Sequence, residues 1–392
     1  MIVFEEAYKI TIEAANPLGI EQVEMMDSVG RVLAKEVVSD VDMPPFDKTA
    51  VDGYACKREN LSQILEVIEI IPAGFSPKKI IGTNQCSKIM TGAKIPEGCD
   101  CVIMVEHTED VDENHIRFVK EKTSTNICYL AEDVKENAII LDKGTLIRPQ
   151  DIAMLASVGC THPFVAKQPG IAVISTGNEL VEPDQKPGDS KIRNSNAYQL
   201  MAQAKRANGN PSYLGIATDD SESLKSFIST GIEDYDITIL TGGVSMGDFD
   251  LVPQILKESG VEILYKSIAV QPGRPTLFGK TGYNKFVFGL PGNPVSSFVQ
   301  FELIVKPFIH HLMGNVFEAL SLRLPLEKAY SRKRYSREKW EPGFVNRDGE
   351  VASTIYHGSA HIHALSHSTV LFRLPLGVES LNKGDLVDVR QI

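Results

Sequence analysis

The feature of this sequence that most constrains its fold is a repeated order of apolar strand, loop and helix over residues 169–313. Short apolar runs such as GIAVIST (170–176) and DITILTGG (236–243) are each followed by a segment with helical spacing. This alternation predicts a parallel, doubly wound α/β sheet, because the returning helices cover both of its faces. Ligands of such sheets bind at the carboxyl ends of the strands, so the loops after these runs form the candidate site.

Helices are expected in two parts of the chain. Those of the α/β region are predicted near 195–208, 221–231, 251–259 and 294–313. Outside it, helical spacing covers 3–15, and a segment over 149–159 begins with proline and ends with glycine, as helices often do. We expect the helix at 149–159 to pack against the N-terminal helix.

The remaining segments have the short apolar runs and turn residues of β structure. After residue 320 these include GSAHIHALSHSTVLFRLP and GDLVDV, which suggest a small barrel or sandwich. The chain is therefore predicted to be multidomain, α/β plus β. The expected domains are a first (linker or dimer) domain of 1–45 and 143–168, an inserted β-rich domain of 46–142, a doubly wound α/β domain of 169–318, and a C-terminal small β-barrel-like domain of 319–392.

Composition narrows the class of protein. At 392 residues the chain is too long for one ordinary core. Its formal net charge of −11 argues against nucleic acid or a membrane surface as the main partner. The six cysteines have no C-x-x-C spacing, and the first residues carry acids where a signal peptide has cations. These features predict a cytoplasmic protein with reduced thiols.

Glycines, acids and a rigid turn follow the strands of the α/β region. They are Thr176, Gly177, Asn178 and Glu179 after the first strand, Asp219 and Asp220 after the second, Gly242, Gly243, Ser245, Asp248 and Asp250 after the third, and Pro291 to Pro294 after the last. Backbone amides of glycine loops and helix N-termini bind phosphate oxygens, whereas carboxylates bind a hard cation. The combination predicts a phosphate ester bound with Mg²⁺.

Each of these features also has a purely structural interpretation. A Gly-Gly pair at a strand end is often only a turn, and Asp219, Asp220 or Glu179 could cap a helix. Their occurrence at successive strand ends favours a shared site. Elsewhere, the basic run 331–339 is either a solvated face or a means of drawing a small oxyanion into a cleft. His361 and His363 are expected on one strand face, where a polar surface is favoured over a transition-metal site.

Six motifs together resemble one known family. They occur in the order PPFDKTAVDGYA, IMTGAKIPEGCDCVIMVE, ISTGNEL, TGGVSMGDFD, PGRP and GLPGNPVSSF. This order and spacing are similar to those of molybdopterin molybdenumtransferases, the family that includes the gephyrin E-domain. The resemblance extends over essentially the whole chain.

The resemblance implies an activity and an assembly. Such transferases insert molybdenum from molybdate into adenylylated molybdopterin with Mg²⁺, and they release AMP. They work as elongated homodimers, whose cleft lies between the α/β domain of one subunit and the first two domains of the other. The molybdopterin adenylyltransferase and recipient molybdoenzymes are implied as possible protein partners.

The resemblance also implies roles for single residues. The acids implied for catalysis are Glu179, Asp219, Asp250 and, from the inserted domain, Asp52; the first three are also implied for Mg²⁺, and Asp248 could assist. The residues implied for substrate binding are Thr91, Asp133, Thr176, Gly177, Ser195, Asn196, Gly242, Gly243, Ser245, Pro291, Gly292, Asn293 and Pro294. Arg274, Gln271 and Ser359 are implied for molybdate.

Several positions depart from the family pattern. Gln271 and Ser267 stand where lysines are usual, Pro342 follows Trp340 and Glu341 where an arginine is often present, and the loop before Asp133 lacks the usual arginine and glycine. Arg274, Lys266 or the 331–339 run could supply the missing charge. Two alternatives therefore stand beside the leading hypothesis: a non-catalytic paralogue that binds molybdopterin or the finished cofactor, and a tungsten-inserting enzyme. A nucleotide-pyrophosphate hydrolase fits less well, because it leaves PPFDKTAVDGYA unexplained.

Overall fold

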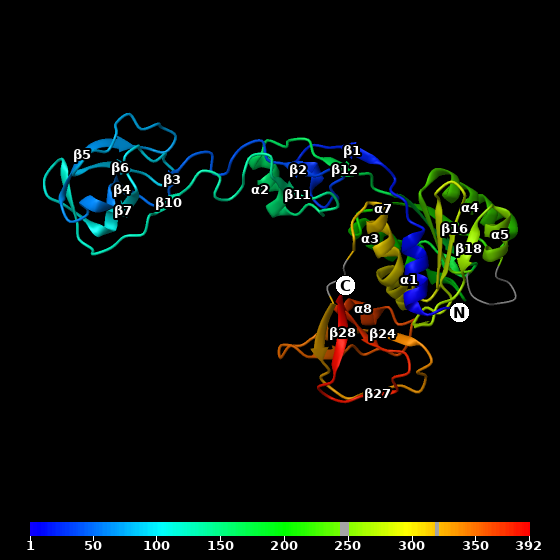
Figure 1. Cartoon of the computed structure of the whole chain (residues 1–392). Helices are drawn as coiled ribbons and strands as arrows, with labels where there is room; N and C mark the ends of the chain where they lie inside the picture. Colours follow the sequence, from blue (N-terminus) through cyan, green and yellow to red (C-terminus); the bar gives the residue numbers. More distant parts are fainter. Residues whose placement is uncertain (244–250, 318–320) are drawn as a thin grey trace.

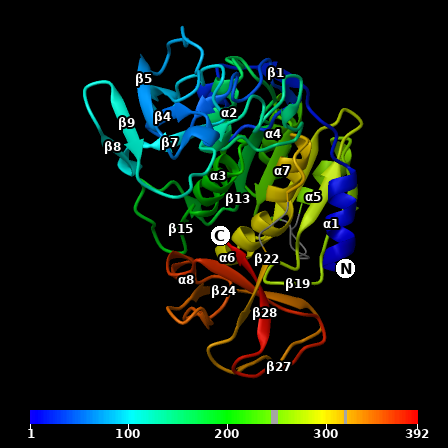
Figure 2. The same ribbon diagram turned by 60° about the vertical axis from the view of Figure 1, so that its left-hand side comes forward.

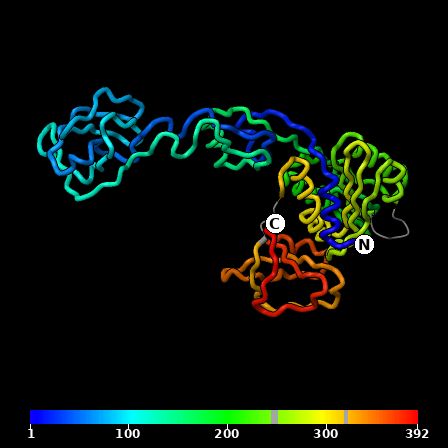
Figure 3. The backbone as a smooth tube through the Cα atoms, in the orientation of Figure 1, coloured from blue at the N-terminus to red at the C-terminus, as the bar shows by residue number. Residues whose placement is uncertain are grey.

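The computed structural model describes residues 1–243, 251–317 and 321–392. Figures 1 and 3 show an elongated molecule with β structure at one end and the α/β sheet at the other. We call residues 44–133 the distal region and the strand pairs that join it to the α/β sheet the connecting region. The central region is the α/β sheet with its helices, and the terminal region is 321–392. Figure 2 shows the terminal region beside the central region from a second side.

The central sheet has the strand order β16-β13-β17-β21-β20-β18. Four of its strands are parallel: β13 (Gly170–Thr176), β16 (Asn210–Ala217), β17 (Ile237–Thr241) and β21 (Phe286–Leu290). Their last residues lie level, because Thr176 pairs with Ala217 and Thr241 with Leu290. The loops after these strands therefore meet at one edge. Two strands that the alternation did not predict, β20 (Leu277–Lys280) and β18 (Glu262–Tyr265), add an antiparallel side to the sheet.

Helices cover both faces of the central sheet, as predicted. One apolar layer joins the sheet to α3 (Asn196–Arg206) and to a long helix made of α6 (Pro294–Gln300), the π-helical turn η4 (Phe301–Val305) and α7 (Lys306–Leu312). The other joins it to α4 (Ser221–Asp234) and α5 (Val252–Glu258). Each helix lies within a few residues of its predicted range, because the apolar spacing marks the face that packs on the sheet.

The expected packing of the two remaining helices on each other is wrong. Helix α1 (Phe4–Glu13) belongs to the central core through Ala7, and Thr11 Oγ1 lies 2.8 Å from Tyr265 Oη. Helix α2 (Pro149–Ser157) packs instead with Leu33 and Val165 in a separate small core. Apolar spacing shows which face of a helix is buried but not against which core, and here the two helices serve different ones.

The distal region is built on a β-sheet, as predicted from its short apolar runs. Its order is β7-β4-β6-β5-β9-β8. These strands are β4 (Gly53–Cys56), β5 (Ile64–Ile71), β6 (Gln85–Ile89), β7 (Cys101–Met104), β8 (Thr108–Asp110) and β9 (His115–Phe118), with β3 (Lys48–Thr49) paired to β10 (Ile127–Cys128). The connecting region pairs β1 (Ile20–Gln22) with β12 (Phe164–Ala166) and β2 (Val37–Val38) with β11 (Ile139–Leu141). Single 3₁₀ turns are η1 (Met26–Ser28), η2 (Arg58–Asn60) and η3 (Val105–His107).

The terminal region is a curled sheet with the order β19-β24-β26-β28-β22. Its strands are β24 (Glu338–Val345), β25 (Val351–Ser353), β26 (Val370–Leu374), β28 (Leu386–Gln391) and β22 (Ser321–Pro325), and β23 (Tyr330–Ser331) pairs with β27 (Ser380–Leu381). Its edge strand β19 (Val270–Gln271) comes from the central part of the chain and places Gln271 opposite Lys339. The terminal region is therefore hydrogen-bonded directly to the central one.

Two smaller findings complete the description. His361 and His363 do not share a strand: His361 lies in a turn and His363 begins the short helix α8 (His363–Ser366). The expected strand is wrong at this point because the sheet resumes only at Val370.

Within the ranges 1–243, 251–317 and 321–392, no helix is long and apolar enough to span a membrane.

Replacing Phe308 with alanine tests the central core. Its ring is fully buried and lies 4.8 Å, centroid to centroid, from that of Phe286 and 5.3 Å from that of Phe288. We expect Phe308→Ala to lower the free energy of unfolding of the central region by about 3–5 kcal/mol in urea titrations, because it leaves a cavity. The matched control is Phe75→Ala in the distal region, where the side chain is 65% exposed and the expected loss is below about 0.5 kcal/mol. Equal losses in the two variants would contradict the assigned core.

Candidate functional site

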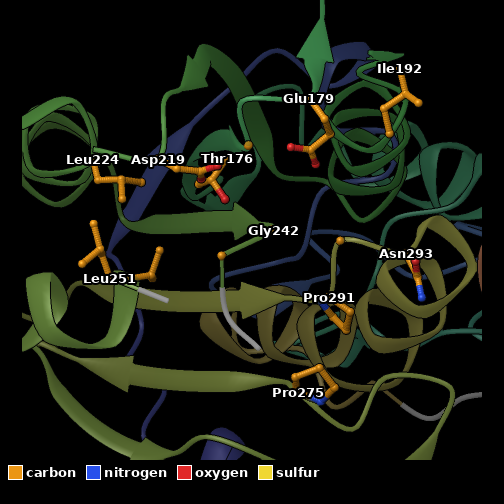
Figure 4. A pocket seen from close by; sticks show the side chains of 14 residues that line it. Thr176, Glu179, Ile192, Asp219, Leu224, Gly242, Leu251, Pro275, Pro291 and Asn293 are labelled. Carbon is orange, nitrogen blue, oxygen red and sulfur yellow. The ribbon is translucent and has the colours of Figure 1, made fainter. Parts of the chain in front are cut away.

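Three adjoining cavities open where the parallel strands of the central sheet end. The first, which we call the acidic cavity, measures about 520 Å³ and contains both Glu179 and Asp219. Figure 4 shows Gly242 between Thr176 and Pro291 in this cavity. Nine residues predicted from the sequence line it: Thr176, Gly177, Glu179, Asp219, Gly242, Gly243, Pro291, Gly292 and Asn293. The prediction that these strand ends converge is confirmed.

The Gly242-Gly243 turn is one that larger residues would not fit. Both residues have positive φ, at 93° and 59°, a region that glycine adopts readily. A Cβ added at Gly242 would lie 2.5 Å from the backbone oxygen of Thr176, and one at Gly243 would lie 2.9 Å from Thr176 Oγ1. Thr176 Oγ1 is itself buried, with no hydrogen-bond partner among the residues described. The turn thus brings backbone to the cavity with no side chain in front of it, as an anion cradle requires.

Asp219 and Asp220 are neighbours with different roles. Asp220 caps α4, since its Oδ1 accepts a hydrogen bond of 2.8 Å from the backbone N–H of Ser223. That bond is the main reason that the pKa of Asp220 is lowered. Asp219 instead accepts from the backbone N–H of Asn178 at 3.1 Å, while its own N–H donates to Asn178 Oδ1 at 3.2 Å. This reciprocal pair joins the ends of β13 and β16 and holds Asp219 at the acidic cavity.

The donor set of the acidic cavity suits Mg²⁺. Glu179 and Asp219 offer carboxylate oxygens, the hard ligands that this ion binds, and it usually keeps several waters besides. A Cβ at Gly177 would lie 2.3 Å from Glu179 Oε2, so the Glu179 carboxylate lies close against this glycine. No group of three or more metal-ligating side chains occurs in the described part of the chain. Two carboxylates supply only part of the coordination that Mg²⁺ needs, so the ion would take its remaining ligands from water, from a bound ligand or from further residues.

The second cavity, which we call the polar cavity, measures about 370 Å³ and contains Ser195 and Asn196. Asn196 Nδ2 donates to Thr241 Oγ1 at 2.9 Å and to the Gly292 carbonyl at 2.7 Å. The start of α3 is thereby fixed to the ends of β17 and β21. Pro294, at the start of α6, lines the same cavity.

The third cavity, which we call the cationic cavity, measures about 510 Å³ and lies between the central and terminal regions. The three residues predicted to bind molybdate line this cavity together: Gln271, Arg274 and Ser359. Lys339 and Glu341 on β24 line it too and form an ion pair, and Tyr330 Oη is hydrogen-bonded to both side chains. Burial and the Glu341 carboxylate raise the pKa of Tyr330, so its hydroxyl stays protonated.

The turn before α6 joins the three cavities. Asn293 lines all of them, and its Nδ2 donates to Ser359 Oγ at 2.9 Å. The Ser359 carbonyl in turn accepts from the backbone N–H of Val295 at 3.0 Å. The cavities therefore share one wall, held in place from both regions.

Comparison with known proteins gives the family. Residues 2–159 match the family described as MoeA N-terminal region (domain I and II), and residues 172–311 match one described as probable molybdopterin binding domain. A molybdopterin molybdenumtransferase of Staphylococcus aureus is 32% identical over 98% of this chain and 94% of its own, and one of Staphylococcus epidermidis is 34% identical over 94% and 90%. The chain belongs to the molybdopterin molybdenumtransferase family.

The fold agrees with this assignment. The crystal structure of the molybdopterin biosynthesis moeA protein from Pyrococcus horikoshii OT3 has 30% sequence identity and a TM-score of 0.87, with both chains covered in full. The expected family is thus confirmed by sequence and by structure. Its members named above are transferases of molybdenum-cofactor biosynthesis, and this chain is an enzyme of the same family.

Three residues that the molybdopterin molybdenumtransferase resemblance assigned to the site do not line the cavities. Asp52 and Thr91 lie in the distal region, and Asp133 is its last residue, with its backbone N–H donating to the Met43 carbonyl at 3.0 Å. Asp52 Oδ1 accepts from the Thr91 backbone N–H at 2.6 Å and from Thr91 Oγ1 at 2.8 Å. These bonds lower the pKa of Asp52 and fix an exposed, ionised carboxylate away from the crevice of its own chain.

The predicted residues Ser245, Asp248 and Asp250 lie outside the described residues. Sequence reasoning missed other residues, above all Asn194, which is 2% exposed. Its Oδ1 accepts from Ser175 Oγ at 2.9 Å, and its Nδ2 donates to Tyr213 Oη at 2.8 Å. The sequence NSN (194–196) at the start of a predicted helix could have pointed to Asn194, but it does not show which of its two asparagines is buried.

Replacing Gly242 with alanine tests the cradle. The new Cβ would meet the Thr176 backbone oxygen, which belongs to the sheet and has no room to move. We expect Gly242→Ala to lower the free energy of unfolding by about 2–4 kcal/mol, measured by urea denaturation. Gly260→Ala is the matched control: its φ is also positive, at 78°, but nothing lies within 4 Å, so it is expected to cost about 1 kcal/mol. Similar losses in both would show that backbone strain alone, rather than the close approach, requires glycine at 242.

Proposed function

We propose that this enzyme inserts molybdenum from molybdate into adenylylated molybdopterin with Mg²⁺, releases AMP and so forms the molybdenum cofactor. The observation that carries the proposal is the meeting of a glycine cradle with two carboxylates, a polar cavity and a cationic cavity at one turn. A substrate with a phosphoanhydride, a pterin and an incoming oxyanion needs these three environments side by side.

The phosphoanhydride is assigned to the acidic cavity. There the amide of Gly243 can donate to a phosphate oxygen, whereas that of Gly242 already donates to the Leu290 carbonyl at 3.3 Å. Glu179 and Asp219 would hold Mg²⁺, with Asp250 as the further acid expected from the sequence. When bound, the ion would neutralise the charge that develops on the phosphates as AMP leaves. Gly177 and Pro291 leave room for the ligand, since neither projects a long side chain.

The pterin is assigned to the polar cavity. A pterin ring has donors and acceptors along one edge, and Ser195 and Asn196 offer neutral groups of both kinds there. The Gly292 carbonyl and the Pro294 ring complete this wall. Asn293, at the junction, can contact the ligand wherever its parts meet.

The oxyanion is assigned to the cationic cavity. Arg274 offers a charged fork to a tetrahedral dianion, and Gln271 and Ser359 offer neutral hydrogen-bond donors. Tungstate has nearly the size and charge of molybdate, so a tungsten-inserting enzyme is an outcome of the same test.

The distal region is assigned to a second copy of the chain. Asp52, Thr91 and Asp133 do not line the cavities of their own chain, yet the distal region extends away from them as an arm. We propose a homodimer in which these residues complete the crevice of the partner, as two-fold pairing of identical chains allows.

The decisive assay follows AMP release from adenylylated molybdopterin by the purified protein with Mg²⁺. Release that depends on molybdate or tungstate is the expected result, and comparison of the two salts gives the metal. Tight nucleotide binding without release would overturn catalysis and support a non-catalytic paralogue instead.

Two neighbouring acids provide a matched pair of variants. Asp219→Asn removes a carboxylate from the acidic cavity, so kcat/KM for AMP release is expected to fall about 100-fold or more. Asp220→Asn makes the same substitution at the next residue, which caps α4. Asparagine caps a helix as well as aspartate does, so this variant is expected to keep kcat/KM within about threefold of the wild type. Similar kcat/KM values for both variants would contradict the role of Asp219.

Mixing two inactive variants tests the shared crevice. Asp52→Asn and Asp219→Asn are each expected to be inactive as homodimers. A mixed dimer would have one crevice with both acids intact and one with neither, so AMP release should partly return when the two chains are coexpressed. Absence of any recovery in a purified mixed dimer, with each chain carrying a different tag, would show that Asp52 does not act in the crevice of the partner.

A further inference from the structure

Four of the nine histidines of the chain lie in one segment of the terminal region, residues 357–367. The structure arranges them as two pairs whose members are four residues apart: His357 with His361, and His363 with His367. The proposed function uses neither pair. Because imidazole is a common ligand of transition metals, two rings held close together are a candidate metal site.

His363 and His367 lie on the same side of α8. His363 begins this helix and His367 directly follows its last residue, so about one helical turn separates them. Both are exposed, whereas Ala364 is only 4% exposed and marks the inward side of the helix. The two rings therefore lie on the outward side, with their centroids 4.8 Å apart and their planes at 62°.

This spacing is that of two imidazoles on one metal ion. An ion bound to a ring nitrogen at about 2.0–2.1 Å lies about 3.2 Å from the ring centroid. At the bond angles of about 90–109° found in square-planar and tetrahedral sites, the centroids of two such rings are about 4.5–5.2 Å apart. The 4.8 Å between His363 and His367 falls within this range, whereas the 5.5 Å between His357 and His361 exceeds it.

The ring nitrogens of this pair are not engaged by other side chains of the described part of the chain. His115 and His162 each place a ring nitrogen next to a carboxylate oxygen, at 2.8 and 2.7 Å, but His363 and His367 form no such bond in the ranges 1–243, 251–317 and 321–392. Nor does any group of three or more ligating side chains occur in these ranges. An ion at α8 would therefore be held by two imidazoles and would keep water in its other positions.

We propose that His363 and His367 form a chelating site for a divalent transition-metal ion. Cu²⁺ is expected to bind more tightly than Ni²⁺ or Zn²⁺, and Mg²⁺ is not expected to bind, because Mg²⁺ takes oxygen ligands. The site does not rest on the proposed function, since neither histidine lines the three cavities. It adjoins them, however, because Ala360 and Ile362, just before α8, line the polar cavity. A bound ion would clamp one turn of α8 and so hold this wall in place.

The test is calorimetric titration of the full-length protein, purified without a histidine tag, with NiCl₂ and with ZnCl₂. His363→Asn and His367→Asn are each expected to weaken binding by about 10-fold or more, because a single imidazole cannot chelate. Both side chains are exposed, so the variants should fold as the wild type does. His361→Asn is the matched control: it removes an exposed imidazole from the same segment but from the other pair, and it should leave the affinity unchanged.

Two further measurements report on the site directly. The electron paramagnetic resonance spectrum of the protein with one equivalent of CuCl₂ should show two nitrogen ligands in the wild type and one in either variant. The temperature of thermal unfolding should rise with NiCl₂ in the wild type but not in His363→Asn, since an ion that binds the folded chain stabilises it.

Two results would overturn the inference. One is the absence of Ni²⁺, Zn²⁺ and Cu²⁺ binding by the wild type, which would leave His363 and His367 as stacked rings on a polar surface. The other is equal weakening by His361→Asn and His363→Asn, which would show that the ion is shared loosely by the whole segment. Neither result bears on AMP release, so the proposed function would stand.

Discussion

The turn from Pro291 to Pro294 is the constraint on which the rest of the site depends. Its Gly292 carbonyl accepts from Asn196, and its Asn293 side chain donates to Ser359, so the turn is tied to the start of α3 and to the terminal region at once. It forms the common wall of the three cavities. Because this wall is neutral and rigid, carboxylates and guanidinium groups can lie in adjacent cavities without forming ion pairs with one another. Mobile side chains in one open cleft would form such pairs.

This separation of charge explains how an acidic protein can hold an anionic substrate. The net charge of −11 would on average repel a phosphate or an oxyanion. At the acidic cavity the repulsion is offset by backbone amides and by the cation that Glu179 and Asp219 suit. At the cationic cavity it would be offset by Arg274 and Arg337, which both line that cavity. Binding would therefore depend on local fields within the cavities, which are less screened by salt than exposed charges are.

The sequence predicted the four parallel strands and the helices of the central region, and the edge at which its ligand residues meet, because both follow from apolar spacing and parallel topology. It could not separate Asp219 from Asp220, since which of two adjacent acids caps the helix depends on where the first turn begins. It predicted the wrong packing partner for α1, because an apolar stripe shows which face of a helix is buried but not which core buries it. It also left the 331–339 run undivided. Only the structure shows that Arg337, just before β24, and Lys339, on that strand, line the cavity and that Lys339 pairs with Glu341.

The distal region gives a physical reason to look beyond a single chain. Two hydrogen bonds from Thr91 hold the Asp52 carboxylate and lower its pKa, so it stays ionised at neutral pH in a fixed orientation. Asp52 is exposed and lies outside the cavities of its own chain. An acid held in this way is suited to act on a ligand brought to it. In the proposed homodimer, the elongated connecting region would provide the reach to the crevice of the partner. The elongated shape, which prevents the chain from forming one compact core, would then be the feature that lets each chain complete the site of the other.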